Sequence, residues 1–269
     1  YSLYVTRDGS LVVFTRWGVN IYNRFSNNFA RLKDNNNLGF SCAEEGKDGK
    51  IWLGVSSFPK IAYVNIANNQ IHTLYIPQLK SQIFNMCCDD KGLLWLSSFN
   101  QGVFVFNPYT HKIVTCLKNL LRVFKSPYRN TLYGLTSDQK IVLVDSRSLK
   151  VEKPICNLAE DVVSINVTAD RRLYFLTHDM ILSLYNLHTH SFDKREIKGI
   201  NSVYNITSLL IDRQSNIWVG TFEEGYLFIP VSKHTFDIDV PLAEHFRNQF
   251  VTFLTSDGKD RFWIATRHN

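Results

Sequence analysis

A repeated pattern of short apolar segments and polar turns constrains this sequence more than any other feature. Its clearest copy runs from Asp212 to Pro230: a polar turn, the apolar segment Ile217–Thr221, a second turn, and another apolar segment. Further copies, some of them weaker, begin at the turns that carry Asp8, Asp48, Asp90, Thr131, Asp170 and Asp257. The chain is therefore built from one small unit used several times.

One apolar or aromatic anchor marks each copy. The anchors are Val12, Trp52, Trp95, Tyr133, Tyr174, Trp218 and Trp263, spaced 38 to 45 residues apart. Repeats of about 40–50 residues with four short strands each are typical of propeller blades. We therefore predict an all-β fold: a seven-bladed β-propeller of four-stranded antiparallel blades, in which the last blade is either closed or incomplete.

Two further columns of residues support this register. A threonine stands three residues after five of the anchors, at Thr15, Thr136, Thr177, Thr221 and Thr266. About twelve residues after an anchor, a strand ends at Asn23, Asn65, Asn107, Asp145, Asn186 or Pro230. We expect the first strand of each unit to lie innermost, and Trp52, Trp95, Trp218 and Trp263 to lie between neighbouring blades, largely buried.

The first strands are predicted from near-continuous apolar runs, which are typical of strands buried on both faces. They are Leu3–Thr6, Phe40–Glu44, Phe84–Cys88, Leu121–Phe124, Val162–Thr168, Ile206–Ile211 and Phe250–Thr255. The first unit begins with its first strand, and the seventh stops after its second. We expect residues 1–269 to form a single propeller domain that is a fragment of a longer protein. The open strand edge would then be covered by more chain or by a partner.

Composition and charge narrow the function classes. The sequence has 269 residues, is 45% hydrophobic and carries a net charge of +6, with a pI of about 9.0. Its basic residues are scattered and no nucleic-acid-binding motif is present, so no nucleic-acid partner is expected. No apolar run approaches the ~18 residues that a membrane span needs. Five cysteines without a CxxC spacing favour small buried side chains over a zinc or redox site.

The sequence offers no assembled active site. His111, His190 and His234 share one repeat position on three different units, so they are predicted to line turns and not to converge on a metal. The adjacent carboxylates Glu44-Glu45 and Asp89-Asp90 would point to opposite faces of a strand. No phosphate loop, HExxH motif or nucleophile elbow occurs. We predict no catalytic residue, no metal site and no cofactor.

The repeat resembles the two-component regulator propeller repeat. The resemblance is carried by Asp48–Gly54, Asp90–Leu96, Gly102–Asn107, Asp212–Thr221 and Gly225–Ile229. It implies the periplasmic sensor region of an inner-membrane hybrid two-component regulator, a type common in gut Bacteroidetes. In that family, a histidine kinase outside this chain responds to carbohydrate breakdown products. The resemblance also implies further sensor modules in the same polypeptide, and we expect a dimer in the intact protein.

The ligand is predicted to bind on the face that carries the loops between second and third strands, together with the loops that lead into each first strand. The opposite face carries Asp-Gly hairpins, which repeat too closely to encode a specific site. Function commonly lies in variable loops on a rigid scaffold. The candidate ligand-binding residues are Arg16, Trp17, Phe58, Phe99, Asn100, Gln101, His178, Phe222, Glu223, Arg267 and His268. Aromatic rings there could stack on a sugar, and the positive net charge favours an acidic oligosaccharide over a neutral one.

Two other function classes remain open. The streptogramin-inactivating lyases are similar seven-bladed propellers, and such an enzyme would recruit His178, Glu223 or His268 from the ligand face. A protein-interaction scaffold would use a blade edge or an apolar patch instead. Metal-dependent turnover would distinguish the lyase, and ligand binding without turnover would distinguish the sensor.

Overall fold

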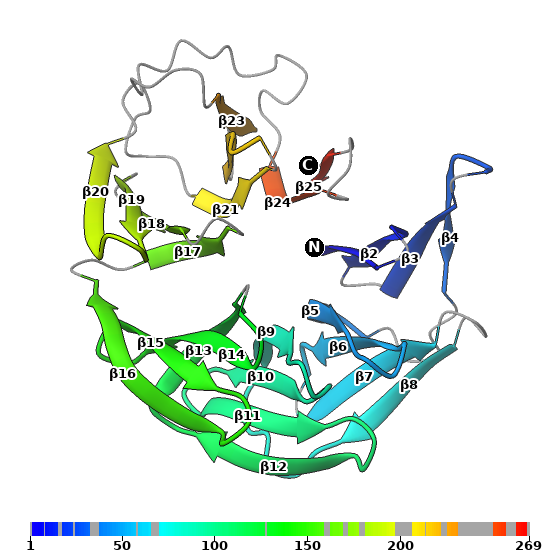
Figure 1. Cartoon of the computed structure of the whole chain (residues 1–269). Coiled ribbons are helices and arrows are strands. Elements are labelled where there is room, and N and C mark those ends of the chain that lie inside the picture. The colour runs from blue at the N-terminus through cyan, green and yellow to red at the C-terminus, as the bar shows by residue number, and fades with distance from the viewer. Residues whose placement is uncertain are drawn as a thin grey trace. The chain divides into compact units, whose positions relative to one another are not determined.

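The structure is a computed structural model of the 269-residue chain, and it consists of β-strands joined by turns (Figure 1). It describes residues 2–7, 9–15, 18–23, 25–32, 38–57, 59–65, 70–126, 128–158, 162–168, 172–177, 181–196, 206–212, 214–221, 225–230, 250–256 and 262–267. No helix within these ranges is long and apolar enough to cross a membrane.

The strands form consecutive antiparallel sheets, which we number in chain order. Sheet 1 contains β1 (Ser2–Val5), β2 (Leu11–Thr15), β3 (Gly18–Asn23) and β4 (Asn28–Arg31); sheet 2 contains β5 (Phe40–Glu45), β6 (Ile51–Val55), β7 (Lys60–Asn65) and β8 (Gln70–Tyr75). Sheet 3 contains β9 (Ile83–Cys88), β10 (Leu94–Ser98), β11 (Gly102–Asn107) and β12 (Lys112–Leu117); sheet 4 contains β13 (Leu120–Lys125), β14 (Thr131–Thr136), β15 (Lys140–Asp145) and β16 (Lys150–Asn157). Sheet 5 contains β17 (Val162–Val167), β18 (Arg172–Thr177), β19 (Ile181–Asn186) and β20 (Ser191–Glu196). Sheet 6 contains β21 (Ile206–Ile211), β22 (Ile217–Thr221) and β23 (Tyr226–Ile229), and sheet 7 contains β24 (Phe250–Ser256) and β25 (Phe262–Arg267).

These sheets confirm the predicted fold class in its main part, an all-β propeller of four-stranded antiparallel blades, but not the number of blades. Six sheets have three or four described strands, whereas the seventh unit is a two-stranded hairpin and not a blade. The described strands therefore form six blades and not the predicted seven, and the two strands of the seventh unit are compatible with the alternative of an incomplete last blade. Residues 231–249, where a four-stranded sheet 6 would have its fourth strand, lie outside the described residues.

The chain divides into two compact units, Tyr1–Leu158 (unit 1) and Ala159–Asn269 (unit 2). Within unit 1, the first strands of successive sheets contact one another, from β1 through β5 and β9 to β13. Within unit 2, β17 contacts β21 and β21 contacts β24. In unit 1 the fourth strands β8, β12 and β16 lie on the outer side (Figure 1). The expectation that the first strand lies innermost is thus confirmed inside unit 1, and in unit 2 the first strands likewise contact one another.

The hydrophobic cores lie between successive sheets. Every residue of β6 and β10 is buried, whereas every residue of β4 is exposed. One cluster joins sheets 1 and 2, and further clusters join sheets 2 and 3, sheets 3 and 4, and sheets 5 and 6. A strand covered on both faces reads as an unbroken apolar run, which is why the second strands dominate the sequence pattern.

The tryptophan predictions are confirmed in part. Trp52 and Trp95 are fully buried, and Trp52 packs against Phe106 of the next sheet with ring centroids 5.4 Å apart. Trp218 stacks on Phe262 of the next sheet at 4.7 Å. Trp218 and Trp263, however, are only partly buried, contrary to expectation. The hairpin of sheet 7 covers Trp218 less completely than a full sheet would, and Phe262 itself is 38% exposed.

A β-bulge recurs near the start of the first strands. The pairing with the second strand skips one residue in six sheets, at Ser41, Phe84, Leu121, Val163, Thr207 and Thr252. Two of these bulges carry hydroxyls that donate to the next sheet: Ser41 to the carbonyl of Ile83, and Thr207 to that of Val251 at 2.7 Å. A bulge re-aims one side chain out of the ladder. Here it turns a side chain of one sheet toward the backbone of the next.

Candidate functional site

A carboxylate–indole contact recurs at the turn between first and second strands. In sheet 3, Trp95 Nε1 donates to Asp89 Oδ2 at 2.9 Å. In sheet 6, Trp218 Nε1 donates to Asp212 Oδ2 at 3.1 Å. The other oxygen of each carboxylate accepts backbone N–H groups of the same turn, such as that of Leu93 at 2.9 Å. A single Asp therefore ties the buried indole to the turn, because charge-assisted hydrogen bonds are stronger than neutral ones.

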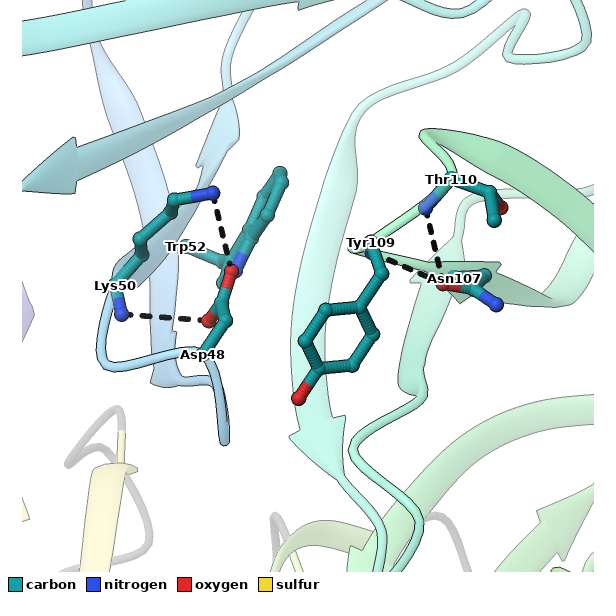
Figure 2. Close-up of polar contacts among 6 residues, drawn as sticks. All are labelled: Asp48, Lys50, Trp52, Asn107, Tyr109 and Thr110. Atoms are coloured by element: carbon teal, nitrogen blue, oxygen red, sulfur yellow. Dashed lines mark hydrogen bonds and ion pairs between the residues drawn. The ribbon is translucent and has the colours of Figure 1, made fainter.

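Sheet 2 forms the same carboxylate–indole contact with an aspartate at a different repeat position. Its aspartate lies four residues before the tryptophan and not six, and Gly46 occupies the position that Asp89 and Asp212 hold elsewhere. Trp52 Nε1 donates to both Asp48 oxygens, at 3.2 and 3.3 Å, and Lys50 pairs with the same carboxylate at 3.4 Å (Figure 2). A Cβ on Gly46 would lie 2.3 Å from Asp48 Oδ1, so the glycine leaves room for this substitute. The sequence register, which aligned Asp90 with Asp48, missed that Asp89 is the partner of Trp95.

The threonine column closes the turns between second and third strands. Thr221 Oγ1 donates to the carbonyl of Gly225 at 2.9 Å, and Thr136 Oγ1 donates to that of Lys140 at 3.2 Å. Thr177 makes the equivalent bond to Ile181 at 3.4 Å. The hydroxyls of Thr136 and Thr177 also accept the N–H groups of Lys140 and Ile181, at 3.0 and 3.2 Å, so each provides hydrogen-bond partners for backbone groups of its turn.

The asparagine column closes the turns between third and fourth strands. Asn107 Oδ1 accepts the N–H groups of Tyr109 and Thr110 at 2.9 and 3.2 Å, as Figure 2 shows. The same arrangement recurs at Asn23, Asp145 and Asn186. Asn and Asp side chains commonly bond their own backbone two residues onward. His111 and His190 occupy left-handed positions of these turns, at φ +55° and +53°, which confirms that they line turns; His234 lies outside the described residues.

Most of the predicted ligand-binding residues cannot be placed. Arg16, Trp17, Phe58, His178, Phe222, Glu223 and His268 lie outside the described residues, and for Arg267 only the backbone at the end of β25 is described. The remaining three, Phe99, Asn100 and Gln101, stand together in the turn between β10 and β11. The structure therefore brings one group of the predicted residues together and leaves the proposed face otherwise a prediction.

The three described candidates differ in what they could offer a ligand. Phe99 is 53% exposed, and its ring lies 4.6 Å from that of Phe84. Asn100 adopts a left-handed backbone, with φ of +56°. Gln101 Oε1 accepts the Lys80 N–H at 2.6 Å, and Gln101 Nε2 donates to the carbonyl of Gln78 at 3.1 Å. Gln101 thus holds the loop that leads into β9, a structural role that the sequence did not reveal.

A pocket of about 290 Å³ lies in unit 1 at the turns that follow the first strands, on the face opposite those candidates. We call it the charged pocket, and it is lined by Arg7, Lys47, Cys88, Asp89, Asp90, Lys125, Ser126, Tyr128, Thr131 and Leu132. These turns differ from one another more than expected: charged residues follow the first strands of sheets 1, 2 and 3, whereas the charged residue of sheet 4, Lys125, is the last residue of β13. A pocket of mixed polar groups near 300 Å³ has the size of a small-ligand site.

An ion pair connects the pocket to the interior of unit 1. Lys125 Nζ contacts Glu44, whose side chain is 7% exposed, whereas that of Lys125 is 57% exposed. Burial raises the pKa of Glu44, and the Lys125 ammonium opposes that rise. Burial lowers the pKa of Lys125, but pairing with Glu44 outweighs it and the net pKa is raised. Glu44 and Glu45 do face different ways: Glu45 Oε2 accepts the Arg7 N–H at 2.7 Å.

Burial raises the pKa of all five cysteine thiols. Burial raises the pKa of Cys88 to about 11 and that of Cys42 to about 12, so both thiols stay protonated at neutral pH. All five cysteines are free. Among the described residues, no group of three or more His, Cys, Asp or Glu side chains could hold a metal ion.

Comparison with known proteins agrees with the fold. Residues 199–223 match the two component regulator propeller family. The chain is similar to the extracellular domain of BT3049 from B. thetaiotaomicron, assigned as a hybrid two-component system, with a TM-score of 0.68 and 14% identity over 98% of this chain. It is also similar to the extracellular domain of BT4673 from the same organism, with a TM-score of 0.73 and 15% identity over 99% of this chain.

This chain spans 38% and 39% of the lengths of those two structures. No curated protein matches its sequence. The resemblance seen in the repeats is confirmed by the family match at 199–223, which covers the turn and second strand of sheet 6. The chain therefore carries a two-component regulator propeller repeat and has the fold of the extracellular domains of such B. thetaiotaomicron proteins.

Proposed function

We propose that this chain is a ligand-sensing propeller from the extracytoplasmic part of a bacterial two-component signalling protein, and that it has no catalytic role. The observation that carries the proposal is the two-component regulator propeller repeat at residues 199–223, in a chain whose fold matches extracellular domains of proteins assigned to such systems. The signal would pass to a histidine kinase elsewhere in the intact protein. The location would be the periplasm.

The use of polar groups in the repeats supports a non-catalytic role. Asp48, Asp89 and Asp212 each bond an indole and a backbone N–H of their own turn. A catalytic acid or base must instead keep an oxygen within reach of a substrate. The carboxylates that recur with the repeat therefore stabilise its turns and indoles.

The ligand we propose is an oligosaccharide released by glycan breakdown. The exposed ring of Phe99 is available for stacking on the apolar face of a sugar, beside Asn100 in the same turn. The other loop residues predicted for this face, with Trp17 and Phe222 as further stacking rings, belong to the same proposal. Other sensor modules of the polypeptide, and a second copy of it, are the proposed protein partners.

A thermal-shift screen against a panel of neutral and acidic oligosaccharides tests the proposal. A ligand at 100 times its Kd adds about 2.7 kcal/mol of stability, which raises the Tm of a domain this size by about 5–10 °C. Phe99→Ala should weaken binding, whereas Tyr75→Ala, which removes an aromatic ring that is 67% exposed on β8, should leave binding unchanged. Metal-dependent turnover of any glycan or cyclic depsipeptide would overturn the proposal, and so would a panel without a single shift.

A further inference from the structure

We propose that the charged pocket binds the anionic group of a small hydroxylated molecule: a carboxylate, sulfate or phosphate. The pocket lies at the ends of β5, β9 and β13 and at the turn after β1, on the face opposite the loops predicted to bind ligand. This inference rests on the proposed sensor function for the role of the ligand. The site itself is argued from the pocket alone.

Two exposed cations at the pocket keep hydrogen-bond donors for a ligand. Lys47 Nζ donates to the carbonyl of Asp90, and Arg7 donates through one guanidinium nitrogen to the carbonyl of Glu45 at 3.2 Å. An ammonium carries three N–H donors and a guanidinium five. Both side chains are therefore held at the pocket by backbone oxygens while most of their donors point elsewhere.

The aspartates of the pocket are already engaged. Asp89 accepts the N–H groups of Lys91 and Leu93, each at 2.9 Å, and the indole N–H of Trp95. Asp90 Oδ2 accepts the N–H of Asn130. These donors stabilise the carboxylates in place, so neither needs a lysine of the pocket as its partner. No bond to Asp90 Oδ1 is described, and that oxygen suits a ligand hydroxyl.

Lys125 adds a third cation to the lining of the charged pocket. Its ammonium contacts the buried Glu44, yet its side chain is 57% exposed. A cation anchored on one side by a buried carboxylate is fixed in position, which lowers the entropy lost when it also binds a ligand. The pocket thus combines three cations from three different sheets with one acceptor for a hydroxyl.

The volume limits the ligand. About 290 Å³ lies at the lower end of the range of roughly 300–1,000 Å³ for small-molecule sites. It accommodates one sugar ring or a molecule of similar size, not a chain of several sugars. An acid sugar, a sugar phosphate or a sulfated sugar each combines an anionic group with hydroxyls.

Isothermal titration calorimetry of the full chain at low salt tests this proposal with four probes: inorganic phosphate, inorganic sulfate, D-glucuronate and, as the neutral counterpart, D-glucose. We expect at least one anion to bind and D-glucose not to bind. Lys47→Ala and Arg7→Ala should each weaken that binding about tenfold, the loss of one charge-assisted hydrogen bond. Lys112→Ala, which removes an exposed lysine of β12 outside the pocket, should have no effect.

The probes separate the possible sources of the anion. Preference for D-glucuronate identifies a sugar acid, and preference for phosphate or sulfate identifies an esterified group; both support an anion site. Binding of D-glucose as tight as that of D-glucuronate would overturn it, and so would anion binding that both alanine variants leave intact. If none of the anions binds while a neutral oligosaccharide raises the Tm of the wild type, the anion site is overturned and the sensor function stands.

Discussion

At the scale of single residues, the contact between an aspartate and a tryptophan indole explains why Asp and Trp recur together in the sequence repeat. A fully buried indole such as Trp95 must find an acceptor for its N–H, and Asp89 supplies it while also bonding the turn. Where the anchor is not a tryptophan, the aspartate is absent. Thr6 and Thr168 stand six residues before Val12 and Tyr174, and the hydroxyl of each forms a hydrogen bond within its own turn.

The substitute in sheet 2 gives a residue-scale prediction. Asp48→Gly should lower the free energy of unfolding by about 1–3 kcal/mol, because the buried Trp52 N–H loses its acceptor. Gly46→Asp alone should also destabilise, since its Cβ would lie 2.3 Å from Asp48 Oδ1. The double variant recreates the arrangement of Asp89 and should unfold within about 1 kcal/mol of wild type. Urea denaturation of the three variants measures this, and simple additivity of the two single losses would contradict it.

The pair of Glu44 and Lys125 gives a prediction about pH. Burial raises the pKa of Glu44 in the folded state, so its contribution to stability is fullest below the unfolded pKa of about 4.3 and falls as pH rises toward the folded value. Lys125→Met removes the opposing cation and extends that fall to higher pH. The variant should therefore lose about 1–3 kcal/mol at pH 8 and clearly less at pH 5.

Chemical denaturation at the two pH values measures this difference. Adding Glu44→Gln to Lys125→Met should recover most of the loss at pH 8, because no charge then remains buried without a partner. Equal destabilisation at pH 5 and pH 8 would show that the pair acts through packing and not through charge.

At the scale of elements, the glycine two residues after a tryptophan reflects close packing between sheets. A Cβ on Gly54 would lie 2.7 Å from Cys42 Sγ of its own sheet and 2.9 Å from the carbonyl oxygen of Ile83; one on Gly220 would lie 2.4 Å from Ser208 Oγ of its own sheet and 3.0 Å from Val251. Ile83 and Val251 belong to the first strand of the next sheet, one residue before its bulge. The second strand of one sheet therefore approaches the first strand of the next without room for a side chain.

Gly54→Ala tests this approach. The added methyl should cost about 1–3 kcal/mol, because the backbone of β9 must move. Sheet 3 provides a matched control, since Ser97 stands two residues after Trp95 and already carries a Cβ there. Its buried hydroxyl has no hydrogen-bond partner among the described residues, so Ser97→Ala should be neutral or slightly stabilising. Thermal unfolding of both variants measures these changes in stability. A Gly54→Ala variant as stable as the wild type would contradict the packing argument.

At the scale of the whole molecule, the periodic part of the structure could be predicted and the aperiodic part could not. The anchors Trp52 and Trp95, the threonine and asparagine turns and the order of strands follow from columns that recur in the sequence. A residue type that recurs at one repeat position indicates a contact that recurs in each sheet. Such contacts can be predicted from the sequence because each turn is closed by residues only a few positions apart. The pattern also indicated that the seventh unit has two strands, as described for sheet 7, but it left open whether the last blade is closed or incomplete.

The charged pocket could not be predicted for the opposite reason. Arg7 and Lys47 share one repeat position, five residues before the anchor, but that position holds Asp90 and Tyr128 in sheets 3 and 4, and Lys125 lies at the end of β13, so no column marks the three cations. Only the contacts among β1, β5, β9 and β13 bring them together. Likewise, Gln101 looked like a free amide in a loop, because its bonds to Lys80 and Gln78 join segments some twenty residues apart.

The central claim is that the repeated residues hold the fold, whereas residues outside the repeat bind ligand. Asp212→Ala and Lys47→Ala test it most directly when urea unfolding and calorimetric affinity for the tightest-binding of the three anions are measured on both. Asp212→Ala should lose about 1–3 kcal/mol of stability and keep the wild-type affinity. Lys47→Ala should keep its stability and lose affinity about tenfold. The claim is contradicted if Asp212→Ala loses affinity at unchanged stability, or if Lys47→Ala binds like wild type.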